Sequence, residues 1–181
     1  MRERCVLSLS LLIPPASEPV SLDALKAHLR VDTTTEDTLI ASLGVAARQT
    51  IEARLGIAFI NQRWRLALTP PLAQCVDLPI GPVSSIDELA DSSGIVAPTL
   101  YLAKLGRHGQ VTLGAGIEGN VSIDFTVGYA DGASVPEDLK LAVKILTAHY
   151  FENREAAGTD RFFAPPQGLE TLLNPWRRVR I

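Results

Sequence analysis

Residues 114–119 read Gly-Ala-Gly-Ile-Glu-Gly and match the GxGxxG pattern of dinucleotide-binding proteins. In such a site the motif ends a strand and opens a helix, whose N-terminus holds the pyrophosphate. Here residues 121–125, which follow the motif, alternate between apolar and polar side chains, and this alternation is typical of a strand. We therefore interpret the glycines as a hairpin turn between two strands and predict no nucleotide cofactor.

Histidine and acidic side chains are the next candidates for chemistry. The three histidines are His28, His108 and His149. His149 and Glu152 have the i, i+3 spacing of metal-binding helices, but such sites need the pair repeated on another helix, and it is not repeated. The sequence contains no GxSxG, HExxH or P-loop motif. We predict no metal and no enzyme, although a site assembled from distant residues stays open. The acidic residues of the middle of the chain, interpreted as solvated surface, are Asp87, Glu88 and Asp91.

The last six residues form a basic and partly apolar end on a chain whose net charge is -3. Their residue types, Trp and Arg, are favoured at protein interfaces. One interpretation is a solvated tail with a packed Trp, and the other is a peptide that docks on a partner. Nucleic-acid contact has less support, because the basic patch does not continue elsewhere. The residues are Trp176, Arg177, Arg178, Val179, Arg180 and Ile181.

Composition gives the class of protein. The chain has 181 residues, of which 46% are hydrophobic and 20% charged, and it can hold one domain or a small domain with an insertion. Cys5 and Cys75 have no metal-binding spacing, and we interpret them as reduced, packed thiols. The charged start and short apolar run of residues 1–13 imitate a signal peptide, but Pro14-Pro15 follows at once. We expect an extended arm or an edge strand there, too short to cross a membrane.

Hydrophobic periodicity predicts helices at both ends of the chain and strands between them. Ser21 is expected to cap the first helix, Thr34 and Asp37 to form a capping box, and Gly56 to end the second helix. The helix that begins at Pro136 is expected to be capped by Ser134 or Val135. The predicted helices are 21–30, 35–55, 136–154 and 169–173, and the predicted strands are 60–68, 75–78, 83–89, 99–104, 110–113 and 121–129. This pattern predicts an α+β fold, in which the middle forms an antiparallel sandwich or small barrel.

Six segments in this order resemble the head–tail connector (adaptor) proteins of tailed phages, which also occur in prophages and gene transfer agents. They are EPVSLDALKAHLRVD (18–32), IEARLG (51–56), FTVGY (125–129), VPEDLK (135–140), HYFENR (149–154) and GLETLLNPWRR (168–178). The resemblance implies a helical connector core formed by residues 18–57 and 133–175. Residues 58–132 would then be a β-rich insertion, residues 1–17 an N-terminal arm and residues 176–181 a docking tail.

The resemblance also implies the function. Such a protein is made in the bacterial cytoplasm and forms a ring of about twelve copies at the head–tail junction of the virion or phage-like particle. Its partners would be the portal protein, a stopper or tail-completion protein and other copies of itself, with DNA only as cargo in the channel and no membrane. The candidates for docking on the portal are Arg154, Trp176, Arg177, Arg178, Arg180 and Ile181. The alternatives are a ligand- or glycan-binding module that uses the β insertion, and a hydrolase with a site across the sheet.

Overall fold

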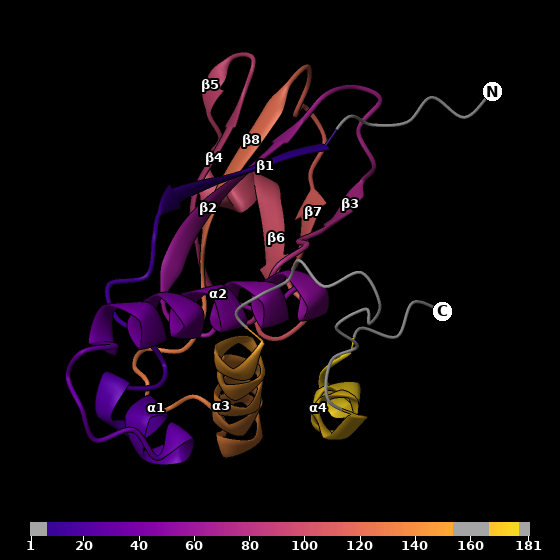
Figure 1. Ribbon diagram of the computed structural model, residues 1–181. Coiled ribbons are helices and arrows are strands. Elements are labelled where there is room, and N and C mark those ends of the chain that lie inside the picture. Colours follow the sequence, from indigo (N-terminus) through magenta and orange to yellow (C-terminus); the bar gives the residue numbers. More distant parts are fainter. Residues whose placement is uncertain (1–6, 154–166, 178–181) are drawn as a thin grey trace, which may run out of the picture. The chain divides into compact units, whose positions relative to one another are not determined.

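The computed structural model describes residues 7–153 and 167–177 (Figure 1). The chain divides into two compact units. Met1–Ala16 and Ile60–Ala130 form one unit, and Ser17–Phe59 and Asp131–Ile181 form the other. We call them the β unit and the helical unit, because the first contains the described strands and the second the four described α-helices. The α+β fold class predicted from the sequence is confirmed.

The helical unit is built on α2, which packs against α1 and α3, while α3 also packs against α4. Each helix directs apolar side chains to one shared core, which includes Ile40, Ile51, Leu139, Leu146 and Leu169. The bounds are α1 Leu22–Leu29, α2 Asp37–Leu55, α3 Glu137–Glu152 and α4 Gln167–Leu173, followed by a short 3-10 helix, η2, at Asn174–Trp176.

Two of the predicted helix ends are confirmed. The Ser21 hydroxyl accepts a hydrogen bond from the main-chain N–H of Ala24 at 3.2 Å and caps α1. Gly56 follows α2 with a φ of 64°, a left-handed conformation that glycine adopts without steric cost. Both ends therefore follow from local residue preference.

The predicted capping box at Thr34 and Asp37 is wrong. Helix α2 begins at Asp37, and the residue before it makes no side-chain cap hydrogen bond. The Asp37 carboxylate instead lies 2.6 Å from Lys26 Nζ of α1. An ion pair between two helices has replaced the local cap, and residue spacing within one helix gives no sign of it.

The start of α3 also differs from the prediction. The helix begins at Glu137, and Pro136 occupies the cap position with an extended ψ of 139°, so neither Ser134 nor Val135 caps it. The Ser134 N–H donates instead to Asp131 Oδ1 at 2.8 Å in the preceding turn. Hydrogen bonds from the Ser134 hydroxyl and main chain hold the pKa of Asp131 below its ordinary value. At its other end α3 stops at Glu152 rather than residue 154.

The β unit consists of two antiparallel sheets. The larger has the strand order β1-β2-β8-β4-β5, and the smaller has the order β3-β7-β6. The bounds are β1 Leu7–Ile13, β2 Gln62–Leu68, β3 Cys75–Asp77, β4 Val83–Asp91, β5 Gly94–Ile95, β6 Tyr101–Lys104, β7 Gln110–Leu113 and β8 Val121–Val127. The segment expected to be an arm or edge strand is thus an edge strand of the larger sheet, with its residues 7–13 paired to β2.

The GxGxxG residues connect β7 to β8, and a strand follows them, not a helix. The connection is not the expected hairpin, because β7 and β8 belong to different sheets. Gly116 and Gly119 have φ values of 94° and 74°, in the region that favours glycine. These glycines therefore allow the chain to turn where it passes from the smaller sheet to the larger one.

One face of the larger sheet is apolar, and the other carries an ion cluster. Leu66, Ile123 and Phe125 are buried on the apolar face, as the alternation predicts. Asp124 lies on the opposite face and yet is only 3% exposed. It accepts hydrogen bonds from Arg65 Nε and Nη2, at 2.6 and 2.8 Å, and these bonds raise the pKa of Arg65. The sequence pattern predicts the face of Asp124 but not its burial.

Candidate functional site

The described part of the C-terminal segment packs inside the helical unit. Trp176 lies in η2, is half-buried, and donates its indole N–H to Asp138 Oδ2 at 2.5 Å. The other carboxylate oxygen of Asp138 accepts from the N–H of Leu139 at 2.9 Å, in the first turn of α3. Trp176 is thus hydrogen-bonded to the first turn of α3 and remains partly exposed.

Arg177 and Arg54 share one carboxylate. Arg54 Nη2, near the end of α2, lies 2.5 Å from Glu170 Oε1 on α4. Arg177 Nη2 binds the other oxygen of the same Glu170. Because one carboxylate faces two guanidinium groups, this cluster has an excess of one positive charge. The Arg177 side chain is 47% exposed.

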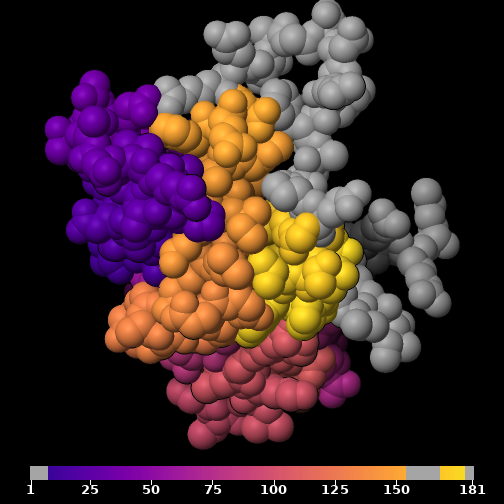
Figure 2. Space-filling model, turned by 60° about the horizontal axis from the view of Figure 1, so that its bottom comes forward, coloured from indigo at the N-terminus to yellow at the C-terminus, as the bar shows by residue number. Residues whose placement is uncertain are grey.

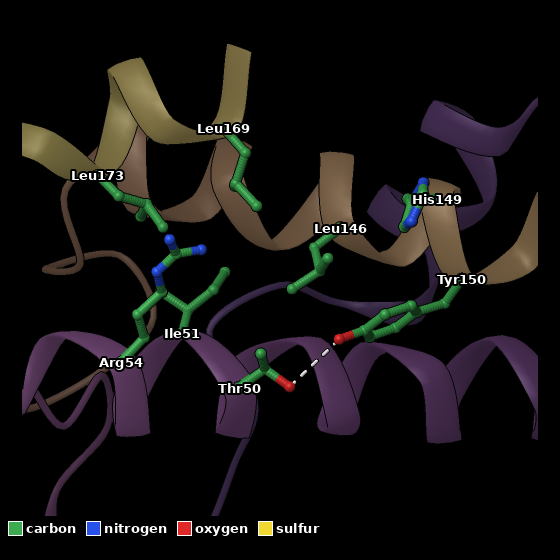
Figure 3. A pocket seen from close by; sticks show the side chains of 8 residues that line it. All are labelled: Thr50, Ile51, Arg54, Leu146, His149, Tyr150, Leu169 and Leu173. Atoms are coloured by element: carbon green, nitrogen blue, oxygen red, sulfur yellow. Dashed lines mark hydrogen bonds between the residues drawn. The ribbon is translucent and has the colours of Figure 1, made fainter. Parts of the chain in front are cut away.

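A small cavity adjoins this cluster. Its volume is about 90 Å³. Figure 3 shows Arg54 directed toward the space between α2 and α4 and a hydrogen bond between Thr50 and Tyr150. The two hydroxyl oxygens of this bond are 3.3 Å apart. The lining residues are Thr50, Ile51 and Arg54 of α2, Leu146, His149 and Tyr150 of α3, and Leu169 and Leu173 of α4. Ligand pockets usually exceed 300 Å³, so the cavity accommodates about one side chain rather than a cofactor.

Helices α3 and α4 border the cavity and lie against each other on the surface, where Figure 2 shows α4 in yellow beside α3 in orange. The C-terminal cluster and the cavity thus belong to one surface of the helical unit. What this surface offers is positive charge beside an apolar recess. Both are features of a protein-binding site, because an apolar anchor and a charged partner can be recognised together.

Only two of the six docking candidates can be placed. Trp176 and Arg177 lie in the surface just described. Arg154, Arg178, Arg180 and Ile181 lie outside the described residues. Sequence reasoning missed Arg54 and Glu170, whose pairing depends on how α2 and α4 pack. The Trp-Arg pattern at residues 176–177 was the available signal for this end of the molecule, and it gave no sign of the cavity.

The other candidates for chemistry are scattered. His28 and His108 are exposed, and His149 lies at the cavity beside Asn153. Within residues 7–153 and 167–177, no group of His, Cys, Asp or Glu side chains is placed to hold a metal ion. Cys75 is exposed, so the expectation of a packed thiol is wrong for it, and Cys5 lies outside the described residues. None of the helices in the described ranges has the length and apolar character needed to cross a bilayer.

Comparison with known proteins identifies the class. The chain matches the head completion protein family over residues 19–163. It is similar to a chain in the neck of an empty GTA particle computed with C6 symmetry, with 29% identity, a TM-score of 0.79, and coverage of 96% of this chain and 97% of that one. A chain in the virion of a native gene transfer agent (GTA) particle has 29% identity, a TM-score of 0.76 and coverage of 96% of both chains.

A third similar chain comes from the neck of a native GTA particle computed with C12 symmetry, with 28% identity, a TM-score of 0.69, and coverage of 94% of this chain and 97% of that one. No curated protein matches the chain. The chain belongs to the head completion protein family. It is a head–tail connector protein of a phage-like particle, where it lies at the head–tail junction. The family that the six sequence segments indicated is confirmed.

Proposed function

We propose that the chain forms a ring in the neck of its particle, joins the portal protein to a stopper or tail-completion protein, and acts by binding without catalysis. The observation that carries the proposal is the likeness over nearly the full length of both chains to subunits of GTA necks computed with C6 and C12 symmetry. Rings are built from head-to-tail contacts, so each copy needs two different faces. DNA would pass through the channel as cargo.

The C-terminal surface is the proposed portal contact. Arg177 and Arg54 carry more positive charge than Glu170 neutralises, and the cavity beside them can take one apolar side chain. The proposal assigns portal docking to Arg154, Arg177, Arg178, Arg180 and Ile181. Trp176 has a different part in it, because its hydrogen bond to Asp138 holds the start of the tail on α3. An acidic and apolar segment of the portal would complement this surface.

The experiment removes residues 178–181 from the chain in cells that produce the particles. Trp176 and Arg177 stay in place, so the contacts with Asp138 and Glu170 are kept. We expect portal-bearing heads without tails, counted by electron microscopy, and loss of the chain from purified heads. Lys104→Ala, on the exposed strand β6, is the control and should leave assembly unchanged. Normal attachment of the shortened chain to heads would refute the assignment of the docking tail.

A further inference from the structure

Strand β1 occupies one end of the larger sheet. Its residues pair with β2, from Leu7 opposite Leu68 to Ile13 opposite Arg63. The sheet order gives β1 no second neighbour among the described residues, so the main-chain N–H and C=O groups of its outer edge have no strand partner there. An edge of this kind can pair with an incoming strand.

The apolar face of the sheet continues onto β1 but is not covered there. Leu9 pairs with Leu66 and Leu11 with Trp64, which places both leucines on the same face as the buried core residues. Leu66 is 1% exposed, whereas Leu9 and Leu11 are 38% and 44% exposed. After a bulge, Ile13 pairs with Arg63, which belongs to the face of the ion cluster, and is 55% exposed. These side chains gain little from folding of the isolated chain, because much of their apolar surface remains in water.

Apart from the bulge near its end, the strand also lacks the protection that edge strands usually have. Natural edge strands carry lysines, prolines or inward-pointing charges that block association. Leu7–Ile13 reads Leu-Ser-Leu-Ser-Leu-Leu-Ile and contains none of them. A seven-residue, uncharged, apolar edge would lead to aggregation unless a defined partner covers it.

We propose that β1 of each copy is covered by the next copy in the ring, which adds main chain to the free edge and buries Leu9 and Leu11. The inference rests on the proposed ring. Strand β1 has no charged side chain, so it offers no ion pair to an acidic or basic peptide or to DNA. Among the described residues, β1 is the one uncharged edge strand of this length, and in the proposed ring every copy has a neighbouring copy available to cover it. The contact is head-to-tail, because pairing of β1 with β1 would close a dimer and stop growth.

The first test changes one face of β1 and uses the other face as the control. In the variant L9E/L11E, two carboxylates occupy the surface that the next copy should bury. In the control S8E/S10E, the same charges lie on the opposite face of the same strand, where Ser8 and Ser10 are exposed. The amount of the chain per purified particle is measured by mass spectrometry. We expect a loss on the order of tenfold or more for L9E/L11E only, because a charge is costly to bury.

The second test identifies the partner and does not depend on how well the glutamate variant folds. A photo-crosslinking phenylalanine analogue replaces Leu11, and purified particles are irradiated. We expect an adduct of twice the chain mass of 19.5 kDa. An adduct with a different protein, or no adduct although the chain is in the neck, would overturn the inference. If the unmodified chain is absent from the neck, the proposed function fails instead, so the two failures are distinguishable.

Discussion

Arg48 is a charged residue at a buried position of α2, and only 4% of it is exposed. Burial lowers the pKa of a guanidinium, but hydrogen bonds and charges from Glu18 and Glu52 outweigh that effect and raise the pKa of Arg48. Its Nε lies 2.7 Å from Glu18, and its Nη1 lies 2.5 Å from Glu52. Glu52 also accepts the N–H of Phe59 at 2.7 Å. Arg48 thus links α2 to the segment before α1, and its partner Glu52 links α2 to the segment that follows it.

We predict that Arg48→Met lowers the free energy of unfolding by about 3 kcal/mol, because it leaves two carboxylates without their buried partner. Arg54→Met is the control on the same helix, and because Arg54 is more exposed, it should cost about 1 kcal/mol or less. Urea unfolding followed by circular dichroism measures both values. Equal losses for the two variants would show that the Arg48 network contributes no more than a surface ion pair.

Residues whose role depends on a distant partner are the ones that the sequence does not reveal. Arg48 and Glu52 have a visible i, i+4 spacing, but Glu18 is 30 positions away. Asp124 alternates as a surface residue and is nevertheless covered by arginines of β2. Trp176 was expected either to pack or to dock on a partner, and its hydrogen-bond partner Asp138 is 38 positions away. The spacing of residues in the sequence predicts which face of a helix or strand a residue occupies. Tertiary packing determines which residues it contacts.

At the scale of elements, Gly44 sets how closely α1 and α2 approach. It is buried in the middle of α2, and a Cβ at this position would lie 2.7 Å from Leu25 Cδ1 of α1. We predict that Gly44→Leu lowers the free energy of unfolding by about 1–3 kcal/mol, because the added side chain overpacks the contact. Ala41→Leu, at an exposed position of the same helix, is the control and should be nearly neutral. Thermal and urea unfolding measure the loss of stability for both variants, and equal losses would contradict the prediction.

Helices and strands can be predicted from the sequence where the pattern of neighbouring residues is enough to define them. The helices and the alternating strands β2 and β8 were predicted because their apolar periods are long and regular. The caps at the starts of α2 and α3 were predicted wrongly. Asp37 pairs with Lys26 of another helix, and Ser134 belongs to a turn made with Asp131. Two sheets were among the expectations, but which strands share a sheet escaped prediction, since turn residues do not say which sheet the next strand joins.

At the scale of the whole molecule, the chain passes between its two units after Ala16, Phe59 and Ala130. The segment 60–130 of the β unit begins and ends at neighbouring positions, because Ile60 and Tyr129 form an isolated β-bridge. Gly128 has a φ of 105°, and a Cβ there would lie 2.4 Å from the carbonyl oxygen of Ile60. The two ends of the β segment are therefore close together, which is the geometry that an inserted segment requires.

We predict that the helical unit folds without the β unit. In the shortened chain residues 1–16 are removed, and a Gly-Ser linker of about four residues replaces 61–128. It should fold because α1 to α4 and the segments beside them, which include the fully buried Phe59, supply apolar core residues, and because roughly 100 residues can bury a sufficient core. Helical circular dichroism and a cooperative thermal transition are the expected results, and the same chain with Leu139→Asp, a fully buried position, should show neither. If both chains lack a cooperative transition, the β segment is not an insertion into an independent helical core but a part of one folding unit.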